Sequence, residues 1–105
     1  MATSRLDQLS AIVRQNPGNA LARYGLAMEY AQQGDHHHAL ESFRALMASN
    51  PDYVATYYQA GRVLQKIGDT QQAREVLEQG IVVCNRVGDF HARSELEAAL
   101  GELAH

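Results

Sequence analysis

The chain has 105 residues and a formal net charge of -3 at pH 7, which suits one domain with one hydrophobic core. Charged residues make up 20% of the sequence and hydrophobic residues 46%, a composition typical of folded globular proteins. Because acidic residues outnumber basic ones, 12 to 9, the overall charge gives no attraction to nucleic acid or to an anionic membrane.

The cysteine count and the apolar runs predict a cytoplasmic protein. Cys84 is the only cysteine, so no intramolecular disulfide can form and nothing indicates an oxidising compartment. The N-terminal stretch places Arg5, Asp7 and Arg14 among its apolar residues, which is unlike a signal peptide. The longest apolar run elsewhere, at 81–84, is too short to cross a bilayer. We therefore expect neither a secretion signal nor a membrane span.

Several short landmarks return along the chain at one fixed spacing of 34 positions. Asn16-Pro17 returns as Asn50-Pro51, and Gly34-Asp35 returns as Gly68-Asp69. The same spacing relates Ala39 to Ala73 and Glu41 to Glu75. A fixed period of this length indicates an array of repeated supersecondary units.

The first part of the chain predicts three helices. Apolar residues at helical spacing over 6–13 predict an amphipathic helix, which Pro17 ends at about Asn16. Asn19 is a candidate N-cap for a second helix, from Ala20 to about Gln33. Gly34 then permits a tight exit, and Asp35 caps a third helix expected from about His37 to Ser49.

The second part predicts three more helices. Asp52 is a candidate cap for a helix over about 53–67, and Gly68-Asp69 forms the turn before a helix over about 71–87. The period then fails, because Asn85 stands where a third proline is due. A last amphipathic helix is expected over 89–104, covering the end of the array.

These landmarks resemble the tetratricopeptide repeat. The apolar residues lie on both sides of the inner glycine, and a proline closes the unit: Leu26, Ala27, Tyr30, Ala39, Phe43, Leu46 and Pro51. The resemblance implies an all-α, right-handed solenoid of helical hairpins with about six helices. It covers 1–105 as a single domain, divided into a half-repeat (1–17), two full repeats (20–53 and 54–87) and a capping helix (89–104). Three positions depart from the family pattern: Arg23, Gly80 and Asn85.

The resemblance also implies that the first helix of each unit lines a concave groove, which binds an extended peptide or protein segment. The residues expected to bind it are Leu21, Tyr24, Met28, Gln32, Tyr58, Gln59, Arg62, Gln65 and Lys66, with Arg93 extending the strip onto the capping helix. Tyr58 and Arg62 are the expected anchors. Because Arg62 and Lys66 lie one turn apart, the expected ligand carries an acidic side chain or a C-terminal carboxylate.

Two other interpretations compete with this groove. In one, Tyr24 and Tyr58 pack between neighbouring helices while Arg62 and Lys66 form a solvated helix face. In the other, the protein is a homodimer or larger assembly that uses its end or convex faces, because a short array leaves large end faces. The resemblance does not extend to the carboxylate clamp that some family members use on chaperones, since Tyr24 and Met28 stand where a lysine and an asparagine are looked for.

Catalytic and metal chemistry are not expected. The run His36-His37-His38 points its side chains about 100° apart on a helix, so the three cannot converge on one ion. Cys84 lies in an apolar run and is expected to be a buried, inert thiol. No phosphate loop, nucleophile elbow or zinc-protease motif is present. The sequence thus predicts a non-catalytic adaptor or scaffold without cofactor, metal or nucleic acid.

Overall fold

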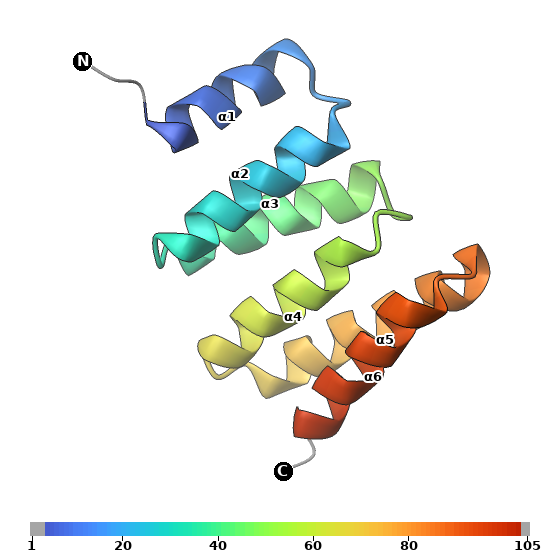
Figure 1. Cartoon of the computed structure of the whole chain (residues 1–105). Helices are drawn as coiled ribbons and strands as arrows, with labels where there is room; N and C mark the ends of the chain where they lie inside the picture. The colour runs from blue at the N-terminus through green and yellow to red at the C-terminus, as the bar shows by residue number, and fades with distance from the viewer. Residues whose placement is uncertain (1–3, 104–105) are drawn as a thin grey trace.

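The computed structural model describes residues 4–103 and contains six α-helices and no strand within them (Figure 1). The helices are α1 (Arg5–Gln15), α2 (Ala20–Gln32), α3 (His36–Ser49), α4 (Ala55–Lys66), α5 (Thr70–Val87) and α6 (Phe90–Leu103). Ala104, the predicted end of the last helix, and His105 lie outside the described residues.

Successive helices form antiparallel hairpins that stack into an elongated array measuring 46 × 29 × 19 Å. Helix α2 packs on α3, α4 packs on α5, and α6 packs on α5 in turn. Helices α2, α4 and α6 also contact one another in sequence and form one layer, with α3 and α5 behind it (Figure 1). Helices α1 and α6 lie at opposite ends. This is the all-α helical-hairpin solenoid that the sequence predicts.

Polar side chains begin most of the helices. Ser4, Asn19, Asp35, Asp69 and Asp89 each accept a hydrogen bond from the backbone amide three residues on, at 3.0 to 3.2 Å. Each bond satisfies an amide that has no partner within its helix. The predicted caps Asn19 and Asp35 are therefore confirmed.

The predicted cap at Asp52 is wrong. Helix α4 begins after Val54, and no side chain caps it. The Asp52 carboxylate instead accepts from the guanidinium of Arg86 and joins the α3–α4 corner to the end of α5. The start of α4 is stabilised by Tyr57, whose hydroxyl donates to the carbonyl of Pro51 at 2.7 Å.

The same corner explains the departure at Arg23. Arg23 stands 34 positions before Tyr57, and its guanidinium donates to the carbonyl of Pro17, as Tyr57 does to Pro51. A cation therefore replaces an aromatic hydroxyl in the same role. Arg23 keeps the corner hydrogen bond although it is not apolar.

The missing third proline changes the length of α5. Asn85 donates an amide that proline lacks, so the helix continues to Val87 and is 18 residues long. Gly88 then ends it in the left-handed region, with a φ of 81° and its amide bonded to the carbonyl of Cys84 at 2.8 Å.

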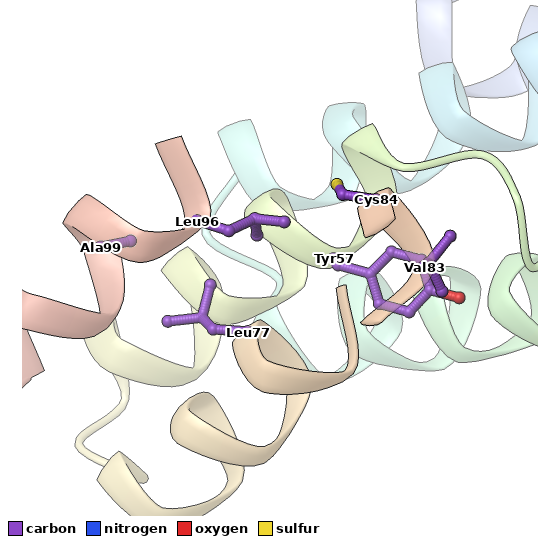
Figure 2. Close-up of a cluster of buried hydrophobic side chains, with 6 residues drawn as sticks. All are labelled: Tyr57, Leu77, Val83, Cys84, Leu96 and Ala99. Carbon is purple, nitrogen blue, oxygen red and sulfur yellow. The ribbon is translucent and has the colours of Figure 1, made fainter. Parts of the chain in front are cut away.

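The core lies between the layers in two adjoining clusters. One, between α2, α3 and α4, contains Ala27, Ala39, Phe43, Ala60 and Val63. The other, between α4, α5 and α6, contains Tyr57, Leu77, Val83, Cys84, Leu96 and Ala99 (Figure 2). Cys84 is fully buried, as its apolar neighbours predict, and burial raises the pKa of its thiol.

Gly80 lets α5 lie close to α4 and α6, the other two helices that form this second cluster. A Cβ atom at Gly80 would lie 2.6 Å from Cβ of Tyr57 and 3.0 Å from Cδ1 of Leu96. Because Cβ of Tyr57 is fixed to the backbone, the helices would have to move apart. The departure from the family's usual alanine is thus matched to the close approach of the α4 and α5 backbones at Tyr57.

We predict that Gly80→Ala lowers the free energy of unfolding by about 1 to 3 kcal/mol, the usual cost of overpacking. The matched control is Gly101→Ala in α6, where an added Cβ meets no atom within 4 Å. This control should raise stability by about 0.5 to 1 kcal/mol, because alanine favours the helix. Urea denaturation followed by circular dichroism measures both changes. Equal effects of the two substitutions would contradict the packing argument.

The cap at Asp35 predicts a dependence on pH. The backbone amide of His38 holds the pKa of Asp35 below its ordinary value of 3.8, and the imidazole of His38 lowers it further. A lowered folded-state pKa means that this stabilisation is present above 3.8 and is lost as the pH falls through the folded-state pKa. Asp35→Asn retains a capping oxygen but does not titrate. The wild type should therefore lose more stability than this variant on acidification, and parallel curves would refute the assignment.

Candidate functional site

The histidine run belongs to a helix start. His38 Nδ1 lies 2.7 Å from Oδ2 of Asp35, and its ring stacks on Tyr30 with centroids 5.1 Å apart. In the next unit the side-chain amide of Gln72 donates to Oδ2 of Asp69 at the same distance of 2.7 Å. His38 thus occupies the place of Gln72 in a repeated capping arrangement. Within residues 4–103 no group of three or more histidine, cysteine or acidic side chains is arranged to hold a metal ion.

Three clefts follow the layer formed by α2, α4 and α6. The first lies between α1 and α2 and has a volume of about 510 Å³, the second lies between α2 and α4 with about 180 Å³, and the third lies between α4 and α6 with about 290 Å³. The predicted residues Leu21, Tyr24, Met28 and Gln32 line the first cleft. Met28 and Gln32 also line the second, together with Tyr58, Gln59, Arg62 and Lys66. The structure therefore brings these predicted residues together along one face.

Tyr58 and Arg62 form the best-defined polar contact of this face. Nη1 of Arg62 donates to the Tyr58 hydroxyl at 3.1 Å, and the guanidinium carbon lies 5.8 Å from the Tyr58 ring centroid. Both contacts orient an exposed guanidinium over the cleft between α2 and α4. Lys66, exposed one turn further along α4, lines the same cleft and adds a second positive charge. Such a pair can hold a carboxylate.

Tyr24 lines the first cleft and also packs against aromatic side chains of neighbouring segments. Its ring centroid lies 6.3 Å from that of Phe43 and 5.5 Å from that of Tyr53. Burial raises the pKa of its hydroxyl, and a hydrogen bond to the side chain of Gln59 partly offsets that rise. Tyr24 therefore joins α2 to α4, as the packing interpretation of the tyrosines expects, while Tyr58 points its hydroxyl to Arg62.

Gln65 and Arg93 lie apart from this strip. Gln65 is exposed on α4, and the guanidinium of Arg93 pairs with Glu97 at 3.2 Å and donates to Asn85 at 2.8 Å. Arg93 also lies over the Phe90 ring, 5.1 Å from its centroid. These contacts hold Arg93 to the end of α5 and leave other residues of α6 to face the cleft.

Sequence reasoning missed the acidic side of the groove. Asp89, His91 and Glu95 line the third cleft, beside Tyr58 and Gln59. His91 Nε2 lies 3.4 Å from Oε1 of Glu95, one turn further along α6. The lengthened α5 breaks the 34-residue period before α6, so the period could not place them. The spacing of four residues between His91 and Glu95 was the available signal.

Sequence reasoning also left α1 out of the site. Arg5, Leu9 and Ile12 of α1 line the first cleft opposite Leu21 and Glu29 of α2. The register of the repeat, which relates Leu9 to Phe43, could have identified these residues as one wall of a groove.

No helix within 4–103 combines the length and the apolar character that crossing a bilayer demands.

Comparisons with known proteins agree with this geometry. A model of the tetratricopeptide repeat matches residues 30–81. The TPR repeat-containing protein PA0015 of Pseudomonas aeruginosa is 31% identical over 98 residues, which is 93% of each chain. The solution structure of protein BPP2914 from Bordetella parapertussis is 30% identical, with a TM-score of 0.84 over 98% of this chain and 90% of that one.

The fold is shared more widely than the sequence. The TPR2B domain of yeast Sti1, solved as a complex with pHsp70, has a TM-score of 0.88 at 13% identity, covering 94% of this chain and 79% of that one. At this identity the likeness concerns the fold alone. Together with the more similar relatives and the repeated helical hairpins, it leads to one assignment: the chain belongs to the tetratricopeptide repeat family, whose domains are protein-interaction modules.

Proposed function

We propose that this protein is a non-catalytic adaptor that holds an extended segment of another protein across α2, α4 and α6. The observation that carries the proposal is the guanidinium of Arg62, oriented by Tyr58 at 3.1 Å over a cleft that Lys66 also lines. An exposed, preoriented cation beside an aromatic ring is suited to recognition. The complex of the Sti1 TPR2B domain with pHsp70 supports a binding role for this fold.

The charges along the layer define the bound segment. Arg62 and Lys66 on α4 favour an acidic side chain or a C-terminal carboxylate. Asp89 and Glu95 on α6 favour a basic residue next to it. Apolar residues of the segment would lie against Met28 and the Tyr58 ring. The proposed ligand therefore carries an acidic group and a basic group in a fixed order, rather than acidic groups alone.

The rigidity of the scaffold supports affinity. Tyr24, Tyr53 and Phe43 lock α2 to its neighbours, so the groove needs little ordering when it binds. The main entropic cost then falls on the segment, which loses its freedom. The protein's own helices supply a fixed template.

We predict that Arg62→Glu weakens binding of peptides selected from a random library by the intact protein. The expected loss is about 10- to 100-fold, because one charged hydrogen bond is removed and a repulsion is added. Arg74→Glu, the same charge change at an exposed position of α5, is the matched control and should leave binding unchanged. Isothermal titration with the selected peptides measures both.

The library itself provides a second criterion. Selected peptides should place an acidic group and a basic group in one consistent order, and Tyr58→Ala should weaken them by a comparable factor because Arg62 loses its orienting hydroxyl. Peptides whose affinity ignores both Arg62→Glu and Tyr58→Ala would move the binding surface away from α4.

A further inference from the structure

Helix α1 lacks the cover that its repeat register provides elsewhere. The 34-residue spacing relates Arg5, Leu9 and Ile12 of α1 to Ala39, Phe43 and Leu46 of α3. The three residues of α3 are 0% exposed, whereas Ile12 is 43% exposed. No residue of α1 is buried, although its apolar positions include Leu6, Leu9, Ile12 and Val13. Within residues 4–103, α2 covers one side of α1 and no helix covers the other.

The uncovered side forms an open apolar cleft. Leu9 and Ile12 form one wall, and Leu21, Gly25 and Met28 of α2 form the other. Its volume of about 510 Å³ exceeds that of the clefts between α2 and α4 and between α4 and α6. Leu21 stands at the rim and is 70% exposed. A cleft of this kind is suited to an apolar knob from a helix.

The opposite end of the array does not supply such a helix. Helix α6 buries Leu96 and Ala99 against α4 and α5 and leaves Ser94, Glu97 and Glu102 exposed. Glu97 is paired with Arg93 at 3.2 Å. A head-to-tail contact would bury these charged groups in an apolar cleft, which is unfavourable. The exposed apolar side chain of α6, Phe90 (59% exposed), lies under the guanidinium of Arg93, which is 5.1 Å from its ring centroid. The exposed apolar residues beside the cleft itself are Ile12 of α1 and Leu21 of α2.

The charges at the rim are self-complementary. Nε of Arg5 lies 3.4 Å from Oε2 of Glu29, and their side chains are 68% and 15% exposed. The rim therefore carries one cation and one anion. Within one copy these two groups pair with each other; in a two-fold dimer that exchanges the pair, Arg5 of each copy would face Glu29 of the other, and each Leu21 would face the other copy's cleft. Isologous dimers require this kind of self-matching surface.

We propose that this protein forms a two-fold dimer through the α1–α2 cleft, in which α1 of each copy covers Leu9 and Ile12 of the other. Both copies use the same surface, so the apolar residues of α1 in each copy are covered by α1 of the other copy. The dimer leaves Tyr58 and Arg62 on α4 accessible, but its interface shares Met28 and Gln32 of α2 with the proposed binding groove.

Light scattering on the full chain across a concentration series tests the dimer. The expected mass is twice the monomer's 11.6 kDa and falls on dilution. Leu21→Glu should weaken the dimer about 100-fold by burying an unpaired charge. Val82→Glu is the control, because Val82 is a similarly exposed apolar residue (66%) on α5 and lies outside the cleft. Circular dichroism confirms that both variants keep their helices.

A charge exchange tests the arrangement of the two copies. Arg5→Glu and Glu29→Arg should each weaken self-association, and mixing the two variants should restore a dimer, because both cross-pairs then carry opposite charges. A monomeric mass at every concentration, or a dimer that Leu21→Glu does not weaken, would overturn the proposal.

Discussion

The array is stable because each amphipathic helix has its apolar face covered by the next helix. Ala39, Phe43 and Leu46 of α3 are completely buried, and Leu77 of α5, at the register of Phe43, belongs to the second cluster of the core. The close approach of the helices depends on small residues such as Gly61 and Gly80, whose added Cβ atoms would lie 2.6 Å from neighbouring side chains. Among the described helices, α1 packs on α2 alone, and α6 packs on α4 and α5.

Helices α1 and α6 differ in how far their apolar residues are covered. Helix α6 buries one apolar side and presents charged residues to solvent, which suits a terminal helix. Helix α1 remains apolar on two sides, and its groove against α2 is open. The proposed dimer would cover this open side of α1.

The predicted binding residues differ in how much they contribute to the packing of the helices. Tyr24 is held between Phe43, Tyr53 and Gln59 and serves the stacking of α2 on α4. Tyr58 packs against the second core cluster and also accepts a hydrogen bond from Arg62, whose exposed guanidinium lies at the cleft between α2 and α4. Arg62 is therefore the side chain that we propose for recognition of another molecule.

The repeat period predicted the fold because it fixes helix lengths, turns and inward faces together. It could not predict features that depend on contacts between units. Asp52 pairs with Arg86 rather than capping α4, and Arg93 donates to Asn85, because Asn85 and Arg86 lie in the last turns of the extended α5. Gly80 follows from the close approach of α5 to the backbone of Tyr57, which is distant in sequence. The cleft at α1 required comparison of burial at equivalent positions, which only the structure provides.

Amide hydrogen exchange at high and low protein concentration tests most directly whether each amphipathic helix needs another helix to cover its apolar face. The account predicts that protection of α1 amides increases with concentration, because a second copy completes their cover, while protection of α4 and α5 stays constant. Protection of α1 that equals that of α4 and does not change with concentration would contradict it, since α1 would then be stable without a covering helix.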